Sequence, residues 1–149
     1  MNSRALVLTV LSALSFRAAS PTAEPSLAET RVRLSPDMVA SESPRADFSG
    51  LADEQDIVGD PPSGKPERGW EIPAQHWTDF PYSATIDLGE ERNLSALWVR
   101  DTFGVGDLVV EAEAEAPAAW ERIASHDCDR FQEWVRLPLD RTARRLRLT

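Results

Sequence analysis

The sequence predicts an all-β domain, either a β-sandwich or a jelly roll, and two observations lead to that prediction. Short segments from Ser83 onward alternate apolar and polar residues with a period of two, which is typical of strands with one buried face. Turns rich in Gly or Pro separate these segments. Several short strands at this spacing favour packed antiparallel sheets.

The first two predicted strands lie on either side of a glycine turn. Ala84–Leu88 (ATIDL) is expected to end at Gly89. Leu94–Asp101 (LSALWVRD) follows, and its alternation places Leu97 and Val99 together on one face.

The next segment has two possible interpretations. Ala and Glu in LVVEAEAEAPAAWERI favour a helix. The apolar spacing in Leu108–Glu115 is two, however, with Val110 and Ala112 on one face, and Pro117 interrupts any helix. We therefore expect a strand here.

Three further strands complete the predicted sheet. They are Trp120–Ala124, Gln132–Leu139 and Ala143–Thr149. In the last of them, Leu146 and Leu148 should face inward, and the arginines between and before them outward.

The N-terminus has the pattern of an export signal. Met1–Arg4 is positively charged, Ala5–Phe16 is apolar, and small residues follow. The apolar run is shorter than the roughly 20 residues that span a bilayer, so we expect no membrane span in the mature chain. A short buried helix is the alternative interpretation. The predicted organisation is a signal peptide (1–20), a linker (21–30) and a secreted, extracytoplasmic domain (31–149).

Net charge and cysteine content restrict the possible functions. The net charge of −9 argues against nucleic acid and anionic membranes as partners. Cys128 is the only cysteine, so no intrachain disulfide forms. His126 and Cys128 allow a metal pair or a nucleophile with its base. A small side chain in a turn is the favoured interpretation, because the sequence motif lacks further partners.

An ordered series of short motifs resembles the discoidin family, also called the coagulation factor type C domain. The series is DEQ at 53–55, GDP at 59–61, Trp70, ATIDLG at 84–89, LWVRD at 97–101, GVGD at 104–107 and TARRLRL at 142–148. The resemblance covers about residues 31–149 and implies a galactose-binding-like jelly-roll sandwich. Members usually continue into a last strand with an acidic residue that helps to hold a cation. The chain stops before it, which indicates a fragment, a C-terminally truncated gene product or an unusually short version of the domain.

The acidic loop LADEQDIVGDPPSGKPERGW, residues 51–70, is where the resemblance implies a structural calcium. Asp53 and Asp60 lie seven residues apart around Gly59 and Pro61, so their carboxylates and nearby carbonyls can converge on a hard cation. A solvated acidic loop and a glycosidase-type carboxylate pair are the alternatives. Because the sequence contains no complete catalytic motif, we expect no enzymatic activity.

A ligand-binding face is expected from the aromatic residues before the ATIDLG strand. Sugar rings present apolar faces that stack on aromatic rings, and their hydroxyls need fixed polar partners. His76 and Trp77 form such a pair, with Arg100 or Asp101 as polar neighbours. Trp70, at the end of the loop, is expected in the core instead.

The predicted function is an exported, non-catalytic, carbohydrate-binding module, which is either the targeting part of a larger secreted glycan-active protein or a fragment of such a protein. Its partner would be a glycan or a cell-surface polysaccharide. Two alternatives stay open. One is a structural or cell-adhesion module that binds protein, and the other is the N-terminal fragment of a secreted glycoside hydrolase.

Overall fold

The computed structural model describes residues 6–13, 29–43, 48–52, 57–59, 61–66, 69–70, 81–114 and 119–149. Within these residues the fold is all-β, as predicted, and contains two short 3-10 turns but no α-helix. The strands are β1 (Leu6–Ala13), β2 (Glu29–Val32), β3 (Val39–Ser41), β4 (Ala84–Asp101), β5 (Asp107–Glu113), β6 (Trp120–Asp127) and β7 (Glu133–Leu148). The 3-10 turns are η1 (Pro36–Met38) and η2 (Ser49–Ala52).

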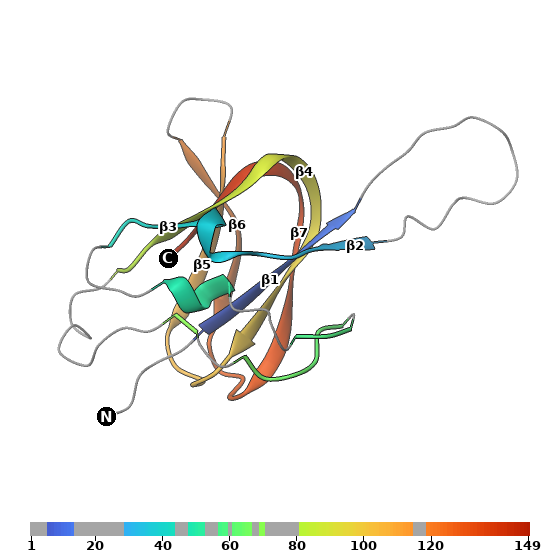
Figure 1. Cartoon of the computed structure of the whole chain (residues 1–149). Coiled ribbons are helices and arrows are strands. Elements are labelled where there is room, and N and C mark those ends of the chain that lie inside the picture. The colour runs from blue at the N-terminus through green and yellow to red at the C-terminus, as the bar shows by residue number, and fades with distance from the viewer. Residues whose placement is uncertain are drawn as a thin grey trace, which may run out of the picture.

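All seven strands belong to one antiparallel sheet (Figure 1). The strand order is β2-β1-β4-β7-β5-β6, and β3 pairs with the first residues of β4. The first half of β4 therefore lies between β3 and β7, whereas its second half lies between β1 and β7.

Strands β4 and β7 are long, and they bend together in the arch that Figure 1 shows. The sequence predicted four separate strands here, and this detail was wrong. Gly89 and Asp140 adopt positive φ values of 81° and 44°, and the β4–β7 register shifts between Asp87 and Arg92. Such local irregularities bend a strand without ending it, so pairing resumes on the other side.

The core lies on the inward face that the alternation predicted. Its buried side chains include Leu97, Val99, Leu108, Val110, Ala112, Leu137, Leu139, Leu146 and Leu148. The helix alternative for the LVVEAEAE segment was wrong, because β5 presents alternate residues to this core. Buried side chains from both halves of β4 and β7 belong to a single apolar cluster, which packs the two halves of the arch together.

The segment between β3 and β4 also supplies core residues, which the aperiodic sequence did not indicate. Phe48, Leu51 and Ile57 are buried there, and Trp70 is buried as predicted. The Phe48 and Trp70 rings lie 4.7 Å apart between centroids. Because Phe48, Leu51 and Trp70 belong to the same apolar cluster as the inward strand residues, the described parts of this segment help to close the core.

The apolar N-terminal segment forms a strand in this structure. Seven residues of β1 pair with β4 and four pair with β2, so the alternative of a short buried helix was wrong. Strand β2 begins at Glu29, just inside the predicted linker. No helix in the described part of the chain is long and apolar enough to cross a membrane. Export remains a prediction of the sequence.

Deletion of residues 1–20 should destabilise the domain, because β4 would lose its neighbour along Leu94–Asp101. Ladder hydrogen bonds contribute about 0.5–1.5 kcal/mol each, so the free energy of unfolding should fall by about 3 kcal/mol or more. Urea denaturation measures this difference, and a chain that begins at Ala5 is the control. Equal stability of the two shortened chains would show that the domain is complete without β1, as a cleaved signal peptide requires.

Candidate functional site

Only two of the predicted site residues lie in the described part of the chain. Asp53, Asp60, His76 and Trp77 lie outside it, so their predicted roles stay predictions. Arg100 and Asp101 end β4 and point to opposite sides of the sheet, because side chains alternate along a strand. The Arg100 guanidinium lies on the outer side, 6.0 Å from the centre of the Trp134 ring.

Asp101 is an inward residue that joins two turns. Its side chain is only 2% exposed, because it shares the parity of Leu97 and Val99. Oδ1 accepts hydrogen bonds from the amides of Phe103 (3.2 Å) and Gly104 (2.6 Å). Oδ2 accepts one from the Arg130 amide at 2.9 Å. The buried carboxylate therefore holds the β4–β5 turn against the β6–β7 turn.

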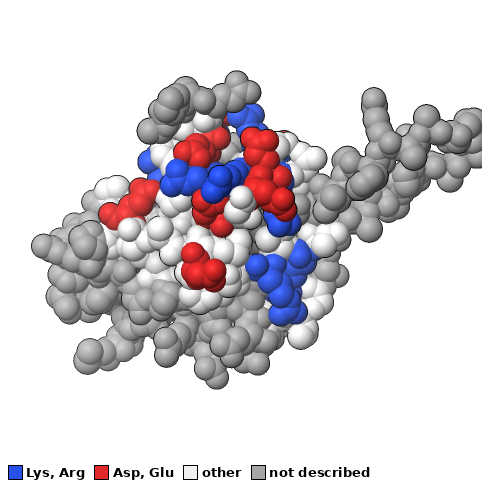
Figure 2. Space-filling model, turned by 45° about the horizontal axis from the view of Figure 1, so that its top comes forward, with Lys and Arg blue, Asp and Glu red and all other residues white. Residues whose placement is uncertain are grey.

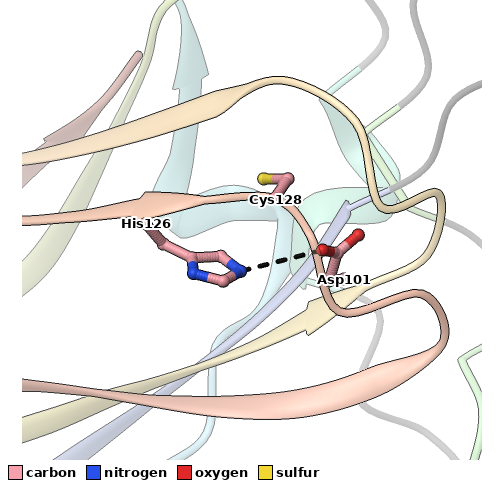
Figure 3. A group of neighbouring side chains, drawn as sticks. All are labelled: Asp101, His126 and Cys128. Carbon is pink, nitrogen blue, oxygen red and sulfur yellow. Dashed lines mark ion pairs between the residues drawn. The ribbon is translucent and has the colours of Figure 1, made fainter.

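His126 and Cys128 approach Asp101 from the end of β6 (Figure 3). His126 pairs with Leu108, so both side chains share the inward face, and Cys128 continues this parity two residues later. His126 Nε2 lies 3.7 Å from Asp101 Oδ2, and its side chain is 9% exposed. The three potential ligand atoms, one from each residue, all lie within 4.8 Å of one another.

The surroundings of Cys128 are strongly acidic. Burial raises the pKa of the Cys128 thiol to about 11, and the nearby carboxylates add to the effect. The contributing acids are Asp101, Asp107, Asp129 and Asp127. The free thiol therefore keeps its proton at neutral pH and is a poor nucleophile.

A second site is a groove of about 460 Å³ near the other end of the β4–β7 pair. Met38, from η1, and Val39, from β3, give it an apolar wall. Ala40 and Thr85 also line it, and five charged side chains come from η1, β4, β5 and β7. They are Asp37, Asp87, Glu113, Arg144 and Arg145.

Most of these charges are already paired with one another. Arg144 donates two hydrogen bonds of 3.0 Å to the Asp87 carboxylate, and this contact lowers the pKa of Asp87. Arg145 donates to Glu113 at 2.9 Å. Arginines of the TARRLRL segment thus pair with acids on the neighbouring strands β4 and β5. Figure 2 shows basic and acidic side chains next to one another on this side of the molecule.

The Trp120 ring, next to these arginines, is already covered by guanidinium groups. Arg145 and Arg147 lie 5.5 Å and 4.8 Å from the centre of the Trp120 ring. Arg147 is fixed in turn by a 2.6 Å hydrogen bond to Glu111. Trp120 is therefore engaged in cation–π contacts within the protein, and the groove offers polar groups and aliphatic carbon to a ligand.

The sequence alone did not predict either group of residues as a site. Asp37 carried no motif, and the groove depends on the pairing of β3 with β4. The position of Asp101 could be predicted in part, because it has the same parity as Leu97 and Val99 and therefore faces inward. Nothing local in the sequence indicates that β5 and β6 bring His126 to the same end of the sheet.

Comparison with known proteins does not assign the chain to a family. No protein-family model matches it, and neither the curated proteins nor the solved structures contain a significant match. The function is therefore inferred from the residues themselves.

Replacing Asp101 by Asn should reduce stability by about 1.5–3 kcal/mol, because an amide NH₂ group would replace one acceptor oxygen against backbone N–H donors. Hydrogen exchange at the Gly104 and Arg130 amides should accelerate with it. Asp129→Asn is the control, since its side chain is 71% exposed and should change stability by less than about 0.5 kcal/mol. If both variants unfold alike, Asp101 does not hold the turns together.

Proposed function

We propose that the protein is an exported, non-catalytic, discoidin-like carbohydrate-binding module with a jelly-roll sandwich fold. The groove between η1, β3 and the β4–β7 pair is the observation that supports this function. It combines an aliphatic wall with carboxylates and guanidiniums held on paired strands. Sites for small polar ligands commonly have this composition.

The groove chemistry suits a polyhydroxylated ligand. A carboxylate oxygen can accept more than one hydrogen bond, so acids that are paired with arginine still accept bonds from sugar hydroxyls. Arginine offers five donors, of which Arg144 uses two on Asp87. The C–H face of a sugar ring would contact Met38 and Val39.

The balance of charge favours neutral or amino sugars. Three carboxylates face two guanidiniums in the lining, and the whole chain carries a net charge of −9. An anionic glycan would meet this excess of negative charge, so we expect it to bind more weakly.

Affinity gel electrophoresis on polysaccharide gels tests the proposal. The full chain should be retarded by at least one neutral polysaccharide, and Asp37→Ala should weaken that binding by about tenfold, the factor for one hydrogen bond to a charged group. Asp129→Ala removes the same charge outside the groove lining and should bind as the parent does.

Absence of retardation on every neutral, amino and acidic polysaccharide would contradict the carbohydrate proposal. The adhesion-module alternative then predicts binding to a protein partner, and that binding should not be competed by free sugars. The hydrolase-fragment alternative predicts an open reading frame that continues after Thr149 into a catalytic region.

Calcium at Asp53 and Asp60 is part of the same proposal and is tested by thermal unfolding. A ligand that binds only the native state raises the midpoint, so excess Ca²⁺ should stabilise the chain and a calcium-selective chelator should reverse the gain. Asp53→Ala and Asp60→Ala should each abolish the shift. An unchanged midpoint would make the loop a solvated acidic segment.

A further inference from the structure

We propose that Asp101, His126 and Cys128 bind a divalent transition-metal ion, with Zn²⁺ as the ion that this donor set fits. The three residues supply one carboxylate oxygen, one imidazole nitrogen and one sulfur. Oxygen, nitrogen and thiolate ligands together are typical of zinc, whereas calcium and magnesium take oxygen alone. Its three residues differ from those that line the groove and from those predicted to bind calcium.

Strand parity places all three side chains at one end of the sheet. Asp101 is the last inward residue of β4, and His126 is an inward residue of β6 opposite Leu108. The Cys128 amide donates to the Gly106 carbonyl at 2.7 Å, which fixes the start of the turn that carries the thiol. Backbone contacts thus hold the main chain of these residues in place before any ion arrives.

The unpartnered imidazole nitrogen of His126 is a second observation that points to a ligand. The side chain is nine-tenths buried, and its Nε2 atom has no hydrogen-bond partner. It points toward Asp101 in Figure 3, but 3.7 Å is too long for a hydrogen bond. Buried polar atoms are normally satisfied, and a bound ion would satisfy this one.

The separations of the ligand atoms and the free lone pair of Asp101 are compatible with zinc coordination. Zn–S and Zn–N bonds of about 2.3 and 2.0 Å place tetrahedral S and N ligands about 3.5 Å apart. The ligand atoms lie within 4.8 Å, so a side-chain rotation of Cys128 closes the site. Asp101 Oδ2 accepts one hydrogen bond, from the Arg130 amide, and keeps a lone pair for the ion.

The local field favours a cation. Asp101, Asp107, Asp127 and Asp129 lie around Cys128, and their negative charge attracts a divalent ion. As the Zn–S bond forms, the S–H bond breaks and the proton passes to solvent, while the imidazole binds through a nitrogen lone pair. Three protein ligands leave a fourth position for water.

Titration of the full chain with Co²⁺ tests the site, because thiolate-bound cobalt absorbs in the near ultraviolet. We expect that absorption, together with the visible bands of tetrahedral cobalt, to saturate at one ion per chain. Zn²⁺ should then displace Co²⁺, following the usual order of affinities. Zn²⁺ alone should raise the unfolding midpoint.

Matched variants identify the ligands. Cys128→Ser should remove the near-ultraviolet band, which no other cysteine can supply. His126→Gln should weaken binding by about tenfold or more, whereas His76→Gln, at the only other histidine, should leave it unchanged.

Three results would overturn the proposal. They are a wild-type chain without thiolate absorption, a stoichiometry of one ion per two chains, and binding that is unaffected by His126→Gln. The first two depend on the wild-type chain alone, so they decide the matter even if a variant fails to fold.

Discussion

The pairing of β4 with β7 is the constraint on which the rest of the structure depends. Thirteen residue pairs join the two strands on both sides of a shared bend. Strands β1 and β3 attach to the free edge of β4, and β5 attaches to β7. The groove lies where the pair begins on β4, and the Asp101 cluster lies where it ends. Both candidate sites are therefore positioned by one ladder of backbone hydrogen bonds.

The charged residues at the two ends of the β4–β7 pair differ, so the two sites suit different ligands. At the groove, the outward arginines of β7 are matched by acids on β4 and β5, so these paired charges are fixed before a ligand arrives. At the other end the acids around Cys128 outnumber nearby bases, and a buried imidazole nitrogen lacks a partner. A paired surface suits a neutral polar ligand, whereas unbalanced negative charge suits a cation.

Much of the sheet could be predicted from alternation alone, because burial of one face requires a period of two. Leu97, Val99, Leu146 and Leu148 are inward as expected. The sequence did not predict the bends, because a glycine such as Gly89 fits both the end of a strand and a bend through a positive φ. The strand β1 was missed because an apolar run with a basic start has the composition of an export signal. The two sites were missed because register, which no local pattern encodes, brings their residues together.

Amide hydrogen exchange, followed by NMR on the full chain, tests the central role of the β4–β7 pair most directly. If one ladder organises the fold, amides at 84–87 and 96–101 should exchange only through global unfolding, with the same free energy of opening as their partners in β7. If one half is protected and the other exchanges through local opening, the two halves of the arch are independent. The β4–β7 pair would then not position both sites.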